Sequence, residues 1–191
     1  MKKIAIATLL VLLAACQAQT TPQGEQASPQ EGATASPRVS ATVDPVKKPA
    51  PVLTVLDQDG KSVDLGALYK QGIVLVYFYP KADTPGCTAQ ACSLRDSYEE
   101  LTSKGVKVIG VSLDDAQSQK DFQKKYDLPF TLIPDTDKTM VEAFGVSHVG
   151  GFASRQAFLI KDGIIEWHDG SASTSKQAED VLTQLESWAK P

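Results

Sequence analysis

Cysteine, histidine and long hydrophobic runs are scarce in this sequence of 191 residues. It contains three cysteines and two histidines, too few for a scaffold built on several disulfides. Lysine and arginine total 19 against 23 aspartate and glutamate residues, so the net charge is −4. A chain of this charge repels a phosphate backbone, and we expect no binding to nucleic acid. The 42% of hydrophobic residues suits one globular domain with additional segments.

The longest apolar run lies at the N-terminus. Residues 4–13 are almost all apolar and follow Met1-Lys2-Lys3, a pattern typical of a signal peptide, because a helix of about ten residues spans only about 15 Å, half a bilayer. The run ends in Leu13-Ala14-Ala15-Cys16, which resembles the lipobox of bacterial lipoproteins. On this resemblance, residues 1–15 are a signal peptide and Cys16 carries the lipid.

A lipid on this cysteine predicts a location in the bacterial cell envelope, facing the periplasm. Gln17 stands where an aspartate would favour retention in the inner membrane, so the outer membrane is favoured. The alternatives are an ordinary secretory signal with an incidental cysteine and an uncleaved leader that serves as the anchor.

A polar segment follows the leader. Residues 17–50 contain no aromatic residue, leucine or isoleucine and are rich in Gln, Ala, Ser, Thr and Pro. Such a segment buries too little apolar surface to offset the entropy lost on ordering. We therefore predict a disordered tether that, with Cys16, occupies residues 16–50 and leads to a globular domain at 51–191.

The domain alternates short apolar runs with helical patterns. We expect an N-terminal hairpin around Asp59-Gly60. Residues 73–79 form a continuous apolar and aromatic run, typical of a strand buried on both faces. Further strands are expected at 106–113, 130–133, 156–160 and 164–168, and helices from the cysteine motif to about 104, at 117–126, at 138–144 and near the C-terminus. Parallel strands joined by helices and ending in a hairpin and a helix predict a thioredoxin-like α/β sandwich, with a mostly parallel central sheet flanked by helices.

The most informative stretch is YPKADTPGCTAQAC, residues 79–92. Cys87 falls just after a buried strand and in the first turn of the next helix, where unpaired N–H groups and the helix dipole favour an anion. Pro85 suits the first helical position, and Gly86 allows a close approach of the backbone. A thiolate in this setting can attack an electrophile and oxidise to a sulfenic acid.

This stretch resembles the active-site loop of the peroxiredoxins, whose pattern is Pro-x-x-x-Thr/Ser-x-x-Cys. The spacing from Cys87 to Cys92 is similar to that of the bacterioferritin-comigratory, or Q, subfamily. The resemblance extends over about residues 51–189, including 108–112 and 128–132, and Arg155 in the stretch RQAFLI matches the family's active-site arginine.

The resemblance implies a role for each matching residue. Cys87 would be the peroxidatic cysteine, and Thr84 would bond to the thiolate and the peroxide through its hydroxyl. Pro80 would shield the pocket from water, and Arg155 would hold the thiolate and polarise the O–O bond. Cys92 would be the resolving cysteine, which forms a redox disulfide with Cys87.

The implied activity is that of an atypical two-cysteine peroxiredoxin. It would reduce hydrogen peroxide and organic hydroperoxides, and a thioredoxin-like donor would reduce the disulfide again. The resemblance implies no cofactor, no metal, a monomer, and contact with the membrane only through the lipid.

The second cysteine raises a geometric difficulty. In an unbroken helix, residues five apart have Cα atoms about 8.6 Å apart, whereas a disulfide needs about 4.4–6.8 Å. The helix turn between Cys87 and Cys92 must therefore unwind before the two can be joined, and the reduced and oxidised forms must differ.

Other interpretations of the cysteines remain open. They include a structural disulfide, an envelope thiol-disulfide oxidoreductase or metallochaperone, a zinc site with His148 and His168, and a Cys-His hydrolase. The zinc site lacks finger spacing, and the oxidoreductase would be expected to carry a shorter gap between its cysteines. A lipoprotein whose domain is a non-enzymatic interaction module is the alternative from a different class.

Overall fold

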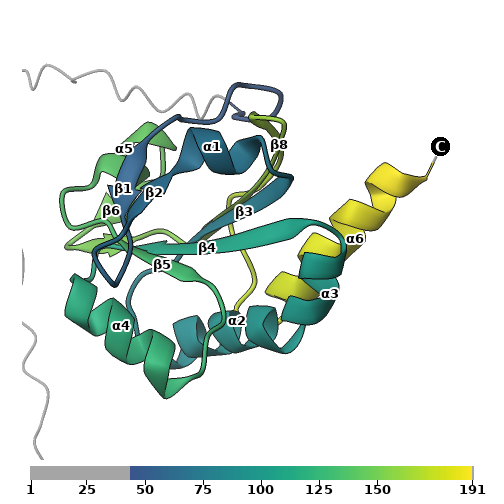
Figure 1. Cartoon of the computed structure of the whole chain (residues 1–191). Helices are drawn as coiled ribbons and strands as arrows, with labels where there is room; N and C mark the ends of the chain where they lie inside the picture. The colour runs from purple at the N-terminus through teal and green to yellow at the C-terminus, as the bar shows by residue number, and fades with distance from the viewer. Residues whose placement is uncertain (1–43, 191) are drawn as a thin grey trace, which may run out of the picture. The chain divides into compact units, whose positions relative to one another are not determined.

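Five strands form the central sheet, in the order β5-β4-β3-β8-β9 (Figure 1). The computed structural model describes residues 44–190, so the predicted leader, Cys16 and most of the predicted tether lie outside the described residues. β3, β4 and β5 run parallel, whereas β8 pairs antiparallel with β3 and with β9. The sheet is therefore mixed, and the thioredoxin-like α/β architecture is confirmed. The strands are β3 (Ile73–Phe78), β4 (Val106–Ser112), β5 (Thr131–Pro134), β8 (Gln156–Lys161) and β9 (Ile164–Asp169).

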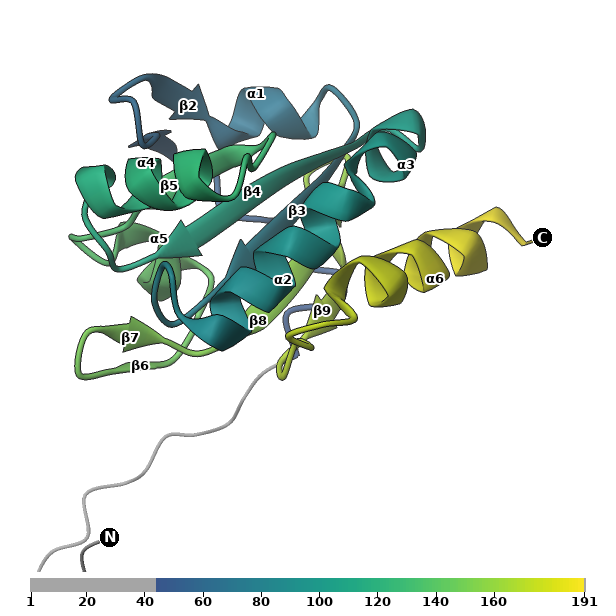
Figure 2. The same ribbon diagram turned by 90° about the horizontal axis from the view of Figure 1, so that it is seen from below.

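Helices cover both faces of this sheet. On one face lie α2 (Pro85–Asp96), α3 (Tyr98–Ser103), α4 (Ala116–Lys125) and α6 (Gln177–Ala189), and on the other α1 (Leu65–Tyr69) and α5 (Thr139–Ala143). Figure 2 shows α2 lying across the first face and α6 starting beside β9 and extending past it to the C-terminus. β3 contacts both layers, because its side chains alternate between the two hydrophobic clusters. This explains the continuous apolar run at residues 73–79, whose members from Val74 to Tyr79 are fully buried.

A glycine sets the packing of Tyr77 between β3 and β4. Tyr77 is paired with Gly110 in the sheet, and a Cβ on Gly110 would lie 2.7 Å from both the Tyr77 hydroxyl and Leu132 Cδ2. No side chain larger than hydrogen fits there without displacing one of them. The Tyr77 ring therefore lies across β4, in the same cluster as Cys87.

The long helix expected up to residue 104 is two helices. α2 ends at Asp96 and α3 begins at Tyr98, with Ser97 between them at φ −103° and ψ 12°. Serine is a poor residue for a helix interior, because its hydroxyl competes for backbone partners. The hydrophobic periodicity continues across the break, which is why the sequence pattern predicts one helix.

Three short elements were not predicted. α1 begins at Leu65, where the Asp64 carboxylate accepts a hydrogen bond from the Ala67 N–H at 3.0 Å, as an N-cap does. The strands β6 (His148–Val149) and β7 (Phe152–Ala153) form a two-residue ladder around two glycines with positive φ. Elements of this length carry too few residues for a periodic signal.

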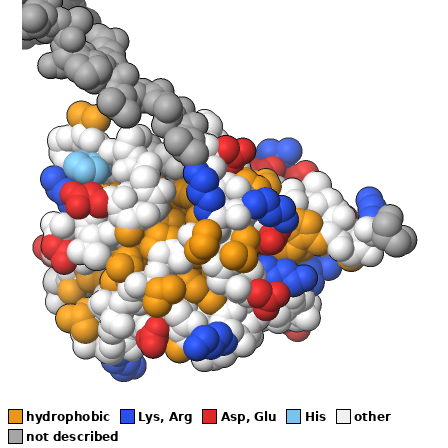
Figure 3. All heavy atoms as spheres, turned by 90° about the horizontal axis from the view of Figure 1, so that it is seen from above, with side chains coloured by type: hydrophobic (Ala, Val, Ile, Leu, Met, Phe, Trp, Pro, Cys, Tyr) orange, Lys and Arg blue, Asp and Glu red, His pale blue; other side chains and the backbone are white. Residues whose placement is uncertain are grey.

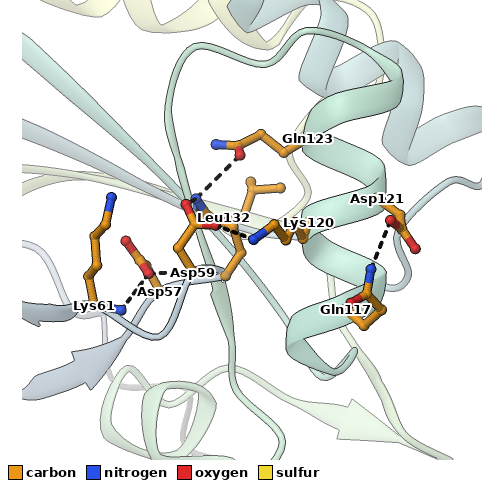
Figure 4. A network of polar contacts seen from close by, with 9 residues as sticks. Asp57, Asp59, Lys61, Gln117, Lys120, Asp121, Gln123 and Leu132 are labelled. Atoms are coloured by element: carbon orange, nitrogen blue, oxygen red, sulfur yellow. Dashed lines mark hydrogen bonds and ion pairs between the residues drawn. The ribbon is translucent and has the colours of Figure 1, made fainter.

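The predicted N-terminal hairpin is confirmed and consists of β1 (Thr54–Leu56) and β2 (Ser62–Asp64). Its turn is tied to α4 and β5 (Figure 4). Gln58 accepts from the Leu132 N–H at 2.9 Å, and Asp59 pairs with Lys120 at 2.8 Å. The hairpin therefore closes one edge of the α/β sandwich.

The chain packs on the sheet before residue 51, the predicted start of the domain. Lys47 donates its N–H to Ile165 O at 2.7 Å, and Ala50 donates to Gly163 O at 2.8 Å.

On the α1 side, hydrophobic side chains are exposed between charged ones (Figure 3), and Val52 is 72% exposed. Among residues 44–190, no helix is long and apolar enough to cross a membrane.

Candidate active site

The strand-to-helix turn after β3 places Cys87 at the N-terminus of α2. Thr84 is the N-cap residue in an extended conformation, and Pro85 is the first helical residue. Proline suits this position because the N–H that it lacks has no partner in the helix anyway. Cys87 is the third residue of α2 and is 2% exposed. The unpaired N–H groups of this first turn stabilise negative charge nearby.

Arg155 reaches the sulfur of Cys87 from the neighbouring strand. It immediately precedes β8, which lies beside β3 in the sheet. Its Nη2 lies 3.3 Å from Cys87 Sγ. The structure thus brings together two residues that are 68 positions apart in the sequence. A guanidinium beside a buried sulfur favours negative charge on that sulfur, because the interaction is screened less than it would be in water.

Gln90 holds the other branch of the guanidinium. Arg155 Nη1 donates to Gln90 Oε1, and Gln90 Nε2 donates to Gln177 Oε1 at 2.8 Å. Both glutamines are fully buried. Neither was among the predicted site residues; the available signal for Gln90 was its place one helical turn after Cys87, on the same face of the helix.

Gly86 leaves room for this arrangement. A Cβ at this position would lie 3.4 Å from Arg155 Nη2 and 3.3 Å from Thr174 Cγ2. The guanidinium therefore packs directly against the backbone of the first turn of α2, where a larger residue would crowd it.

A hydrogen-bond network supports the loop between β3 and α2. Tyr79 donates its hydroxyl to Gln119 Oε1, and Gln119 Nε2 donates to Ser112 Oγ at 2.7 Å. Ser112 donates to Asp114 Oδ2 at 2.7 Å, and the same carboxylate oxygen accepts from the Ala82 N–H at 2.7 Å. The loop is thus fixed to the end of β4 and to α4.

The loop is fixed a second time at Asp83. Asp83 has a positive φ of 57°, and its carboxylate accepts from Lys125 Nζ at 2.7 Å and from the Tyr126 hydroxyl at 2.7 Å. These two hydrogen bonds, that of Lys125 first, lower the pKa of Asp83. The ion pair is exposed to solvent, so its contribution to stability is small.

The other two predicted residues of the loop, Thr84 and Pro80, make no hydrogen bond to the Cys87 sulfur in this structure. The Thr84 hydroxyl donates to Lys81 O at 3.0 Å, so in this conformation its proton is engaged within the loop and its oxygen is left as an acceptor. Pro80 is half-buried, two residues after the end of β3. The predicted bond from Thr84 to the thiolate is therefore not formed here.

Cys92 lies in the same continuous helix as Cys87. It is half-buried, and both thiols are free. At the ideal helical spacing their Cα atoms are about 8.6 Å apart, beyond the reach of a disulfide. In this structure the two cysteines are therefore not joined.

The two histidines belong to different sheets. His148 is in β6 and His168 is in β9, in different sheets. The His168 ring stacks on Phe158, and its Nε2 bonds to Gln156 Oε1 at 2.9 Å. Within residues 44–190, no cluster of three or more His, Cys, Asp or Glu side chains could hold a metal ion.

Comparison with known proteins identifies the family of the chain. The model of the AhpC/TSA family matches residues 46–168. The chain belongs to the AhpC/TSA family. Within this peroxiredoxin family, its relatives support the Q or bacterioferritin-comigratory subfamily.

Curated relatives cover most of the described domain. Chloroplastic peroxiredoxin Q of Oryza sativa subsp. japonica is 42% identical over 142 residues, 72% of this chain and 65% of the rice protein. That of Sedum lineare is 38% identical over 141 residues, 72% of this chain and 75% of the relative. The chain thus spans about 65% of the length of the rice enzyme.

Solved structures of a peroxidoxin and of a bacterioferritin comigratory protein have a similar fold. Peroxidoxin BcpB of Mycobacterium tuberculosis superposes with a TM-score of 0.70 at 28% identity, over 74% of this chain and 96% of its own. The bacterioferritin comigratory protein of Xanthomonas campestris gives 0.67 at 26% identity, over 74% and 98%.

The predicted location in a bacterial cell envelope is wrong. Curated relatives are chloroplastic proteins, which contradicts a lipid-anchored, periplasm-facing location at the outer membrane. That prediction depended on Leu13-Ala14-Ala15-Cys16 and on Gln17. A motif of a few small and apolar residues has low specificity, and these residues lie outside both the family match and the described residues.

The ion pair at Asp83 generates a prediction on pH. Asp83→Asn removes the charge paired with Lys125 but keeps a side chain that tolerates positive φ. Because the pKa of Asp83 is lowered in the folded state, the pair stabilises above the unfolded carboxylate pKa, and this contribution is lost as pH falls through the folded pKa. In thermal unfolding, the variant should melt slightly below the wild type at pH 7, and the difference should shrink between about pH 5 and about pH 3.

The matched control is Asp162→Asn, since Asp162 also has a positive φ, 51°, and forms no ion pair within residues 44–190. It should show no such pH-dependent difference. An Asp83→Asn difference of equal size at pH 7 and pH 3 would contradict the role of the ion pair.

Proposed function

We propose that this chain is a thiol-dependent peroxidase whose Cys87 reduces hydrogen peroxide and organic hydroperoxides. The observation that carries the proposal is the 3.3 Å contact between Arg155 Nη2 and the buried Cys87 sulfur at the N-terminus of α2. Membership of the AhpC/TSA family supports it. So does the bacterioferritin comigratory protein of Xanthomonas campestris, which has alkyl peroxide reduction activity.

In the first step, the Cys87 thiolate attacks one oxygen of the hydroperoxide. The S–O bond forms as the O–O bond breaks, and the other oxygen takes a proton and leaves as water or an alcohol. Cys87 becomes a sulfenic acid. Negative charge develops on the leaving oxygen, where the Arg155 guanidinium and the first N–H groups of α2 can stabilise it.

In the second step, the Cys92 sulfur attacks the sulfur of the sulfenic acid. The S–S bond forms, the S–O bond breaks, and the hydroxyl leaves with the Cys92 proton as water. Because α2 holds the two cysteines too far apart, its first turns must open before this step. A dithiol donor of the thioredoxin type then reduces the disulfide. We also propose that the enzyme acts as a monomer.

The burial of Cys87 disfavours the two alternative functions. An oxidoreductase that exchanges disulfides with folded proteins needs an accessible sulfur, whereas Cys87 is 2% exposed. A non-enzymatic interaction module gives no reason to place an arginine on a buried thiol. A small hydroperoxide, in contrast, can enter where a protein cannot.

Attachment of a lipid to Cys16 stays a prediction from the leader sequence. The intact mass of the isolated protein tests it.

The first test removes the proposed nucleophile. Cys87→Ser should abolish peroxide consumption supported by an excess of thioredoxin or dithiothreitol, down to the background without enzyme. Serine is close in size and can still accept a hydrogen bond from Arg155, so circular dichroism and the melting temperature should change little. Turnover well above background in a folded Cys87→Ser protein would refute the assignment.

The second test concerns the guanidinium. Arg155→Ala should slow the reaction of reduced protein with peroxide by about 10²–10³-fold, the usual effect of removing one donor to a developing oxyanion. Arg155→Lys should recover only part of the rate, because an ammonium cannot bond in fixed geometry to both Cys87 and Gln90. Stopped-flow measurement of the peroxide step and of the thioredoxin step separates the roles. Equal slowing of both steps would mean that Arg155 is only structural.

The third test concerns the resolving residue. Cys92→Ser should react with the first equivalent of peroxide as the wild type does and then accumulate Cys87 as sulfenic acid, which oxidises further with more peroxide. Dimedone labelling and mass spectrometry follow both species. If this variant cycles with thioredoxin at the wild-type rate, Cys92 is not required for resolution.

A further inference from the structure

A chain of buried amides joins the Arg155 guanidinium to the C-terminal helix. Arg155 donates to Gln90 Oε1, and Gln90 donates to Gln177 Oε1 at 2.8 Å. Gln177 is the first residue of α6 and is fully buried. Buried polar groups bonded in series stabilise one geometry strongly, because water cannot replace a lost partner. The position of α6 is thus coupled to the position of the guanidinium on Cys87.

A second bond lies directly beside the first. Ser93 Oγ on α2 accepts from the Ala178 N–H at 3.1 Å, one of the N–H groups at the start of α6 that have no partner within the helix. Lys176, the N-cap residue of α6, makes no side-chain cap. The start of α6 is therefore held by hydrogen bonds to α2, since its own N-cap residue makes no side-chain cap.

These bonds cross the segment that must move. Gln90 lies between Cys87 and Cys92 in α2, so opening the turns between the two cysteines carries Gln90 away from both Arg155 and Gln177. Gln177 Nε2 is already buried without a hydrogen-bond partner among the described residues. Opening would deprive its oxygen of a partner as well, which is unfavourable in a buried site.

We propose that Gln177 is a positioning residue that controls the opening of α2. Through Gln90 it holds Arg155 on Cys87 for the peroxide step and keeps the segment between the two cysteines helical. The same bond opposes the unwinding that joins them. Gln177 therefore sets how long the sulfenic acid persists, and with it the partition between disulfide formation and over-oxidation to the sulfinic acid. The kinetic half of this inference rests on the proposed peroxidase function.

The substitution Gln177→Met tests the bond with little change in shape. Methionine is unbranched, of similar length and adaptable in buried sites, but its thioether is only a weak acceptor for Gln90. The matched control is Leu182→Ala, which loosens the packing of α6 on the same hydrophobic cluster and leaves the amide chain intact.

Hydrogen exchange of the reduced protein measures the opening of α2 between Cys87 and Cys92, and the measurement does not depend on catalysis. In Gln177→Met, the amides of residues 87–92 should exchange about tenfold faster than in the wild type, as expected for the loss of one buried hydrogen bond. In Leu182→Ala, exchange should increase in α6 and not selectively in this segment. If residues 87–92 exchange alike in Gln177→Met and in the wild type, or alike in the two variants, the proposal is overturned.

Treatment with peroxide measures the ratio of Cys87–Cys92 disulfide to Cys87 sulfinic acid. Gln177→Met should form the Cys87–Cys92 disulfide several-fold faster and yield less sulfinic acid at a given peroxide excess, while its peroxide step is slower than that of the wild type. An unchanged ratio of disulfide to sulfinic acid would overturn the kinetic role of Gln177. Absence of any peroxide oxidation of Cys87 in the wild type would instead refute the proposed function, and the exchange result would still decide the coupling of Gln177 to α2.

Discussion

The site depends on one contact, between the guanidinium of Arg155 and the buried sulfur of Cys87. Three separate parts of the fold maintain it. β3 leads through a turn to Cys87 at the start of α2, and Arg155 immediately precedes β8, the strand beside β3. Gln177 at the start of α6 bonds to Gln90, which in turn accepts a hydrogen bond from Arg155. A cation and a sulfur held together away from water require no reorganisation when charge develops, which is the usual basis of electrostatic catalysis.

The same helix serves two needs that conflict. In the proposed mechanism, the peroxide step requires α2 intact, because its first turn supplies the N–H groups and carries Gln90 to the arginine. The disulfide requires Cys87 and Cys92 closer together than an intact helix allows. The break at Ser97 separates α2 from α3, so the segment that must open belongs to a helix of only twelve residues. Opening can therefore remain local, while α3 and the sheet stay folded.

The loop before α2 is held by several hydrogen bonds. The loop before α2 is bonded to β4 and α4 through Tyr79, Ala82 and Asp83, and Tyr77 packs into the space left by Gly110. Pro80 and Thr84 lie within this supported loop, so their position relative to Cys87 is set by the scaffold. In the proposed mechanism, this supported loop would stay in place while the turns between Cys87 and Cys92 open.

The sequence alone determined the order of the main elements and the place of Cys87. A run such as residues 73–79 must be buried on both faces wherever it lies, and Pro85 begins a helix for local reasons of backbone geometry. The short elements α1, β6 and β7 and the break at Ser97 escaped prediction, because propensities over so few residues are weak. The leader residues predicted a location that the relatives contradict, because a short targeting motif is not constrained by a fold.

Only the tertiary structure decided what surrounds the sulfur. Arg155 was found through a resemblance to a family, and no local pattern connects it with Cys87. Gln90 and Gln177 are 87 residues apart and each alone is an ordinary polar residue of a helix. Their contact exists because α2 and α6 pack side by side on one face of the sheet. Hydrophobic patterning specifies which faces are buried, whereas the pairing of buried polar groups depends on where distant helices meet.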